Sequence, residues 1–145
     1  MIDSQNELIK HFEGCSLSSY KCPAGKWTIG YGHTGSDVYK GLTITQKEAD
    51  DLLTSDLIKY EGIIKSLVRV PLNKNQKTAL VSFVFNVGDG AFKRSTLLRL
   101  LNLGEYRAAA SEFRKWDKID REPSHGLAVR RVAEAELFRR ETKLA

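Results

Sequence analysis

Three side chains near the start of the chain could carry out chemistry together: the carboxylate of Glu13, the thiol of Cys22 and the hydroxyl of Thr28. A carboxyl group can give a proton to a leaving group, a thiolate can attack or stabilise a positive centre, and a hydroxyl can hold a water molecule. A Pro-Ala-Gly turn separates Cys22 from Thr28. We predict that the three side chains line the floor of a cleft.

The segment that carries Thr28 has the pattern of a strand from Trp27 to His33. Alternation places its large side chains on one face and its small ones on the other: Trp27, Ile29 and Tyr31 against Thr28, Gly30 and Gly32. The second face then offers one hydroxyl beside bare backbone, which lets a ligand approach closely.

The elements around this stretch are expected to position it. Apolar residues at helical spacing precede Gly14, which stops the helix, so Glu13 lies at a helix C-terminus; Asp3 or Ser4 can cap the start. From Leu17 to Leu42, short alternating pieces and frequent glycines indicate a small sheet of two or three strands.

The remainder of the chain is predicted to be helical. Thr45 and Glu48 form a capping box that opens a periodic segment of about 23 residues, roughly 35 Å long, which can join two lobes and ends before Pro71. Further helices follow: one capped at Asn73, one led by Ser95, one from Glu105 to Trp116, and one after a polar loop from Asp117 to Gly126. The fold class is therefore α+β, mostly α.

Composition describes an ordinary globular chain. It has 145 residues, 41% hydrophobic and 28% charged, which excludes a disordered protein. A formal charge of +5 favours a polyanionic partner, although a solubilising surface would give the same value. The N-terminus has no apolar signal-peptide core and no run approaches the roughly 20 residues of a membrane span, so we expect synthesis in a cytoplasm with both cysteines reduced.

The spacing of Glu13, Cys22 and Thr28, with the strand that follows, resembles phage-type lysozymes, the T4-lysozyme-like endolysins of glycoside hydrolase family 24. Their signature is a glutamate, eight residues, an aspartate or cysteine, five residues and a threonine that opens a T-I-G-x-G-H strand. Further matches run in order along nearly the whole chain: Ile44-Thr45, Val68 to Asn73, Phe85 to Gly88, Ser95 to Leu97, Arg130-Arg131 and Leu137-Phe138. The resemblance is in particular to endolysins of temperate phages that infect Gram-negative bacteria.

The resemblance implies a glycosidase, a lysozyme that hydrolyses the β-1,4 bond between N-acetylmuramic acid and N-acetylglucosamine in peptidoglycan. Glu13 matches the general acid of the family, which is described as inverting. Cys22 stands where many members carry aspartate, and it could stabilise positive charge, act as a nucleophile or position water. Because a free thiol is mostly neutral at pH 7, an electrostatic role requires a lowered pKa. Thr28 is assigned to positioning water and substrate.

The resemblance also implies residues beyond the catalytic three. A structural pair, His33 and Asp56, would tie the sheet to the long helix and raise the pKa of the histidine. Substrate-binding positions are matched at Gly32, Phe85, Asn86, Ser95 and Arg130. The implied architecture is a single lysozyme domain over residues 1–145, with a small lobe at about 14–44, a connecting helix at about 45–68, and a helical lobe at about 71–145 that includes the N-terminal helix.

Other interpretations of the same residues are open. A lytic transglycosylase would cut the same bond without water, but its glutamate usually works without the Cys22 and Thr28 partners. A wall-binding or nucleic-acid-binding module is a third class, although no nucleic-acid motif is present. His11, Cys15, Cys22 and His33 could be metal ligands, but known zinc patterns use closer, paired spacings, so we expect neither metal nor other cofactor.

Cys15 allows a redox hypothesis, in which a bridge to Cys22 holds the protein inactive; we favour instead a small buried hydrophobe at Cys15. The expected partner is bacterial peptidoglycan, whose stem carboxylates would attract the basic chain. We expect a monomer without stable membrane insertion and without nucleic acid, which accumulates in the host cytoplasm and reaches the cell wall through holin lesions.

Overall fold

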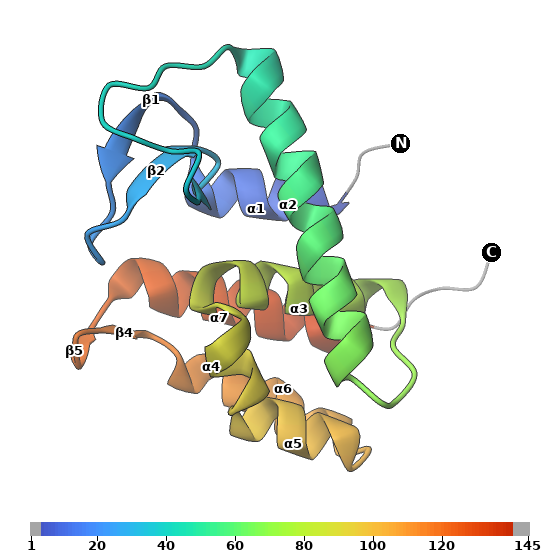
Figure 1. Ribbon diagram of the computed structural model, residues 1–145. Coiled ribbons are helices and arrows are strands. Elements are labelled where there is room, and N and C mark those ends of the chain that lie inside the picture. Colours follow the sequence, from blue (N-terminus) through green and yellow to red (C-terminus); the bar gives the residue numbers. More distant parts are fainter. Residues whose placement is uncertain (1–3, 141–145) are drawn as a thin grey trace. The chain divides into compact units, whose positions relative to one another are not determined.

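The computed structural model of the chain describes residues 4–140, so the cap expected at Asp3 or Ser4 lies outside the residues and side chains it covers. Contacts between residues divide the chain into two compact units, one up to Lys59 and one from Tyr60 onward, which are treated separately below. The boundary falls inside α2 (Gln46–Leu67), drawn as a single continuous helix in Figure 1. Within residues 4–140, no helix combines the length and apolar character needed to cross a membrane.

The first unit contains α1 (Ser4–Glu13) and a three-stranded antiparallel sheet of β1 (Ser16–Lys21), β2 (Trp27–Gly30) and β3 (His33–Thr34), in that order. The predicted small sheet is therefore confirmed. Helix α1 ends as expected, because Gly14 adopts a left-handed φ of 65° while its N–H donates to the carbonyl of Lys10. Glu13 is thus the last residue of α1.

The prediction of one strand from Trp27 to His33 is wrong. Strand β2 ends at Gly30, and the chain turns before β3 begins at His33. The reason is local, because Gly30 and Gly32 have φ values of 64° and 76°, which extended strands do not contain. Ile29 consequently pairs with His33 in the antiparallel ladder.

Helix α2 begins as the sequence predicts. The hydroxyl of Thr45 accepts a hydrogen bond from the N–H of Glu48 at 3.1 Å, and the Glu48 carboxylate accepts one from the N–H of Thr45 at 3.0 Å, which forms the capping box. On its first-unit part, buried apolar residues recur every four positions and form one packed face: Ala49, Leu53 and Leu57. Gly30 lies against this face: a Cβ there would lie 3.6 Å from the Ala49 backbone, an ordinary contact, so its φ of 64° and not the available space favours glycine at this position.

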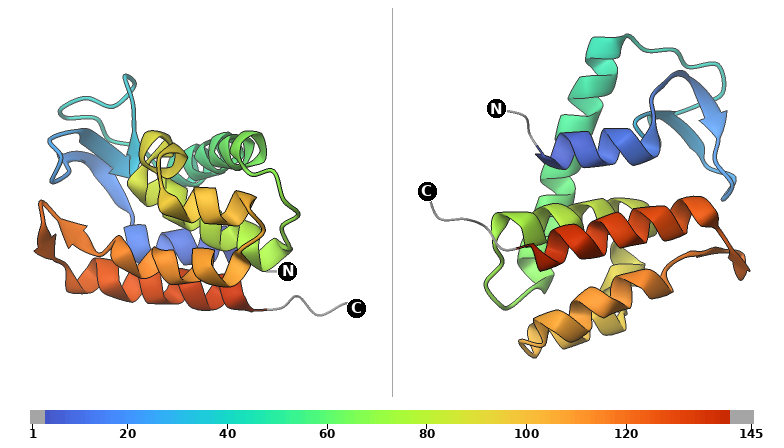
Figure 2. Two further views of the ribbon diagram at one scale, coloured as in Figure 1. Left: turned by 90° about the horizontal axis from the view of Figure 1, so that it is seen from below. Right: turned by 180° about the vertical axis from the view of Figure 1, so that it is seen from behind.

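The second unit is helical around α3 (Lys74–Val87), whose residues Thr78 to Val84 are all buried. Its capping box is present, with Asn73 and Gln76 each accepting from the backbone N–H of the other. Helix α7 (His125–Arg139) lies along α3, as both views in Figure 2 show. The remaining helices complete the unit: α5 (Thr96–Asn102), α6 (Tyr106–Glu112) and the 3₁₀ turn η1 (Phe113–Lys115).

Three local features of the second unit differ from prediction. A short helix α4 (Asp89–Lys93) fills a segment in which glycines had masked any helical pattern. The helix expected from Glu105 to Trp116 ends its α-helical part at Glu112 and closes with η1. The expected loop contains a small hairpin of β4 (Lys118–Ile119) and β5 (Glu122–Pro123), after which Ser124 caps α7.

Candidate active site

The hairpin of β1 and β2 brings the predicted thiol and hydroxyl together. Tyr20 of β1 stands opposite Thr28 of β2 in the ladder, and Cys22 follows β1 directly. A tight turn closes the hairpin: the N–H of Cys22 donates to the carbonyl of Lys26 at 2.9 Å, and the N–H of Gly25 donates to the carbonyl of Cys22 at 2.8 Å. These two backbone hydrogen bonds therefore fix the position of the Cys22 backbone, from which the thiol side chain extends.

The environment of the Cys22 thiol lowers its pKa. Partial burial of the side chain raises its pKa, but hydrogen bonds from the backbone at Lys26 and Ala24 and from the Thr28 side chain outweigh that effect, so the pKa of Cys22 lies below its ordinary value. The electrostatic role required a lowered pKa, and no basic side chain is needed to produce it. Hydrogen-bond donors of the turn supply the effect instead.

Thr28 is almost completely buried, with 3% of its surface exposed. Its hydroxyl donates to the carbonyl of Lys26 at 3.0 Å and is also a hydrogen-bonding neighbour of Cys22. A hydroxyl has one proton but two lone pairs, so while it donates to either partner it can still accept from a small molecule. So little exposed surface suits a water molecule better than a sugar ring.

Tyr20 is a site residue that the sequence analysis missed. The pKa of its phenol is raised by burial and then by the negative charges of Glu13 and Cys22, so its hydroxyl lies within electrostatic reach of both. Tyr20 therefore remains a protonated donor facing two acidic groups. Tyr20 stands opposite Thr28 in the β1–β2 ladder, so the two side chains lie on the same face of the sheet, and this register cannot be seen in the sequence alone.

Cys15 and Cys22 are both free thiols, and Cys15 is exposed, so the favoured expectation of a buried hydrophobe at Cys15 is wrong. All of β1 lies between the two cysteines. At the rise of an extended strand their Cα atoms are about 20 Å apart, whereas a disulfide needs a separation of about 7 Å or less. A bridge between them is therefore incompatible with β1 as it stands.

The expected contact between His33 and Asp56 is present. The Nδ1 atom of His33 lies 2.8 Å from a carboxylate oxygen of Asp56, and Nε2 lies 3.0 Å from Asp37, which the sequence analysis did not identify. The hydrogen bond to Asp56 is the largest cause that raises the pKa of His33 from 6.5 to about 9; burial opposes it and Asp37 adds to it. With a carboxylate at each ring nitrogen, the imidazolium is the favoured form.

The other expected substrate-binding residues lie in different surroundings. Gly32 lies in the turn between β2 and β3. In the second unit, the ring of Phe85 packs 5.2 Å from that of Tyr60. Ser95 is 7% exposed and caps α5: its hydroxyl accepts from the N–H of Leu98 and donates to the carbonyl of Phe92. With its proton used in this way, the Ser95 hydroxyl has a structural role.

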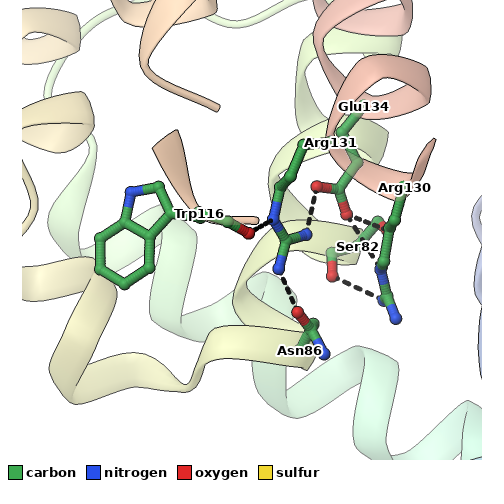
Figure 3. A network of polar contacts seen from close by, with 6 residues as sticks. All are labelled: Ser82, Asn86, Trp116, Arg130, Arg131 and Glu134. Atoms are coloured by element: carbon green, nitrogen blue, oxygen red, sulfur yellow. Dashed lines mark hydrogen bonds and ion pairs between the residues drawn. The ribbon is translucent and has the colours of Figure 1, made fainter. Parts of the chain in front are cut away.

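Arg130 belongs to a buried polar network on α3 and α7 (Figure 3). The carboxylate of Glu134, with no exposed surface, accepts from Arg130 at 3.2 Å, from Arg131 at 2.6 Å and from the hydroxyl of Ser82 at 2.5 Å. Arg130 also donates to the carbonyl of Ser82 at 2.9 Å. Such a buried charge needs its partners, because an unpaired ion in this environment is strongly destabilising.

Arg131 connects this network to Asn86, which is exposed at the end of α3. Its guanidinium donates to the side-chain oxygen of Asn86 and to the carbonyl of Trp116 (Figure 3). Since arginine cannot accept a hydrogen bond, the Asn86 oxygen must face Arg131 and its amide nitrogen must point away from it. Asn86 therefore presents a donor of fixed orientation.

Among residues 4–140, no group of three or more histidine, cysteine or acidic side chains could hold a metal ion. The candidate site of the first unit consists of Glu13, Tyr20, Cys22 and Thr28. Glu13 and Cys22 are acidic groups, Tyr20 is a donor near both, and Thr28 can hold water. This set fits proton transfer and water attack.

Comparison with known proteins identifies the family of the chain. The family model described as Phage lysozyme matches residues 10–134, which include all four of these residues. The chain belongs to the phage lysozyme family. Among the relatives of this chain is an endolysin of Acyrthosiphon pisum secondary endosymbiont phage 1, 45% identical over 135 residues that cover 90% of this chain and 92% of the relative. An endolysin of Salmonella phage P22 is 47% identical over 134 residues, 90% and 91% of the two chains.

A solved structure extends the likeness to the fold. The muramidase domain of SpmX from Asticaccaulis excentricus superposes on this chain with a TM-score of 0.87. The two are 38% identical, and the match covers 97% of each chain. The α+β fold is therefore a lysozyme fold.

Proposed function

We propose that this phage lysozyme is an endolysin that hydrolyses the β-1,4 bond between N-acetylmuramic acid and N-acetylglucosamine in peptidoglycan. Membership of the family implies glycosidase activity, and similar proteins are described as endolysins and as a muramidase domain. The observation that carries the proposal is the grouping of Glu13, Tyr20, Cys22 and Thr28, with a thiol whose pKa is lowered by the Thr28 side chain and the turn.

In the proposed reaction, Glu13 is the general acid and gives its proton to the glycosidic oxygen as the bond to the anomeric carbon breaks. A water molecule adds its oxygen to that carbon from the other side. Thr28 holds the water by accepting one of its hydrogens, and the Cys22 thiolate takes up the proton that the water loses. Solvent then returns both acidic groups to their starting states, so charge and atoms balance.

The burial of Thr28 supports this division of roles. Thr28 is 3% exposed, so it can contact a small water molecule but offers too little surface to bind a sugar ring. A thiolate beside it also supplies the negative charge that favours a developing oxocarbenium ion. Both roles require the thiolate form of Cys22, and the lowered pKa of the thiol makes that form easier to reach.

Substrate contacts beyond the four residues above are also proposed. Asn86 presents an amide donor, so it suits an acceptor such as a carbonyl or carboxylate oxygen of the glycan or its peptide stem. Gly32, Phe85 and Arg130 are proposed as further contacts by resemblance alone. The net charge of +5 would attract the stem carboxylates, and this attraction should weaken as salt is added.

Clearing of outer-membrane-permeabilised Gram-negative cells tests the catalytic assignment. Replacing Glu13 with Gln removes the proton but keeps the shape, and we expect the rate to fall by about a hundredfold or more. The matched control is Glu7→Gln on the same helix, which should clear cells at the wild-type rate. Equal rates for the two variants would refute Glu13 as the acid.

Product analysis tests the reaction type. Mass spectrometry of digested muropeptides should show products that have gained water. Anhydro sugars would instead identify a lytic transglycosylase, the alternative that uses a glutamate without a bound water.

The route to the cell wall is proposed from the resemblance: a monomer accumulates in the host cytoplasm and leaves through holin lesions. Expression with and without a holin gene should give lysis only in the first case. Lysis without the holin would contradict the route while leaving the catalytic proposal intact.

A further inference from the structure

A basic hollow in the second unit has no role in the function proposed above. It encloses about 690 Å³, and its lining includes four cationic side chains: Arg69, Lys93, Arg94 and Arg99. No carboxylate is among its lining residues. Four positive charges in one concavity are a large concentration for a chain whose net charge is +5.

These cations are available to a ligand. All four residues are exposed, and within residues 4–140 none of them forms an ion pair. The ion-paired carboxylates of the second unit are used elsewhere, by Lys115, by Lys118 and by the buried arginines of α7. An anion bound in the hollow would therefore reduce the mutual repulsion of the four cations.

The hollow has a rigid frame, because the cations come from three segments that are fastened together. Asn102 at the end of α5 accepts a hydrogen bond from the backbone N–H of Arg69 at 2.7 Å and donates to the carbonyl of Leu67 at 3.0 Å. This side chain fixes the segment after α2 against α5. At the other end of α5, the Ser95 cap fixes the junction that carries Arg94.

We propose that this hollow is a binding site for a phosphate group. Three of the four cations are arginines, whose forked N–H donors match phosphate oxygens, and cations from separate segments suit a group with three terminal oxygens. A phosphate monoester carries up to two charges at pH 7, whereas a peptide-stem carboxylate carries one. The phosphate could be free in solution or part of a lipid headgroup, and the chemistry of recognition is the same.

Titration with inorganic phosphate, followed by amide NMR shifts at constant ionic strength in sodium chloride, tests the site. The amides of Thr96 and Asn102 should shift and saturate. The double variant Arg94→Gln with Arg99→Gln should bind about tenfold more weakly or worse. The matched control, Arg107→Gln with Arg114→Gln, removes two charges outside the hollow and should bind like the wild type.

Further variants separate the possible causes. Arg99→Lys keeps the positive charge but loses the planar, forked N–H donors of the guanidinium group. Weaker phosphate binding by this variant than by the wild type supports recognition by guanidinium geometry. Circular dichroism must show that each variant is folded. Shifts that never saturate, or equal losses in the hollow and control variants, would overturn the proposal.

Sedimentation with vesicles containing phosphatidic acid distinguishes the two sources of phosphate. Loss of vesicle binding in the hollow variant but not in the control assigns the site to a lipid headgroup. Unchanged vesicle binding, with weakened phosphate binding, assigns it to a soluble phosphate. The inference is independent of catalysis, so Glu13→Gln should bind phosphate as the wild type does.

Discussion

Replacing Asp56 with Asn should destabilise the protein in a manner that depends on pH. Asn can still accept a hydrogen bond from the ring nitrogen of His33, so the change removes charge with little change of shape. The side chains of His33 and Asp56 are 13% and 16% exposed, so solvent screens their interaction only in part. The pair is therefore a suitable place to measure the contribution of a partly buried charge.

The magnitude follows from the pKa of His33, which rises from 6.5 to about 9 on folding. A group with a raised pKa binds its proton more tightly in the folded state, so its stabilisation is fully present below pH 6.5 and is lost as the pH rises through about 9. The whole shift corresponds to about 3 kcal/mol. Because Asp56 is its largest cause, we expect Asp56→Asn to cost about 2 kcal/mol at pH 5.5 and under about 0.5 kcal/mol at pH 9.5.

Urea unfolding, followed by tryptophan fluorescence between pH 5.5 and pH 9.5, measures this difference. Asp37→Asn is the matched control, since Asp37 binds the other ring nitrogen of His33 but its side chain is 61% exposed. This control should cost less at every pH. A loss for Asp56→Asn that is the same at pH 5.5 and pH 9.5 would show that the charged pair does not stabilise the fold.

Three other predictions concern the two sites. Thr28→Val removes a hydrogen bond that lowers the pKa of Cys22, so alkylation of Cys22 by iodoacetamide should require a higher pH. Glu134→Gln removes the carboxylate charge that pairs with the buried guanidinium groups of Arg130 and Arg131 and should cost about 3–5 kcal/mol in urea unfolding. Asn86→Asp keeps the oxygen that Arg131 binds but removes the outward donor, so stability should be retained or increased while KM for solubilised peptidoglycan rises.

Each of these has a control and a result that would contradict it. Alkylation of Cys22 is measured in a Cys15→Ser background, and Thr34→Val, a threonine variant in strand β3, is the control. If Thr28→Val and Thr34→Val give the same pH profile, the hydrogen bond from Thr28 does not lower the pKa of Cys22. Glu136 is exposed on the same helix, so Glu136→Gln should lower the free energy of unfolding only slightly. An equally small loss for Glu134→Gln would show that the buried polar network is not needed for stability. An unchanged KM for Asn86→Asp would remove the amide donor from the substrate site.

The parts of the fold that could be predicted from sequence were those fixed by local chemistry. Capping boxes located the starts of α2 and α3, and Gly14 located the end of α1, because each depends on a few adjacent residues. The continuous strand from Trp27 was mispredicted for the opposite reason. Alternation of side chains does not reveal that two glycines will take left-handed conformations and turn the chain.

The site was predictable only as residue types and spacing. The sequence suggested a thiol and a hydroxyl, but the lowered pKa of Cys22 depends on backbone donors of the turn, which no motif displays. Tyr20 was overlooked because its role arises from ladder register opposite Thr28. The orientation of Asn86 depends on Arg131, a residue distant in sequence whose contact only the packing of α3 and α7 creates.

The β4–β5 hairpin offers a place to lengthen the chain. Its base is closed by the N–H of Ser124, which donates to the carbonyl of Asp117 at 2.8 Å, and Arg131 holds the carbonyl of Trp116 just before it. Its tip, Asp120 and Arg121, is exposed and has φ values of 48° and 71°, a turn that non-glycine residues rarely form. A peptide tag or a pair of new chain ends placed there would interrupt little beyond a strained turn, since both ends of the hairpin are anchored independently of its tip.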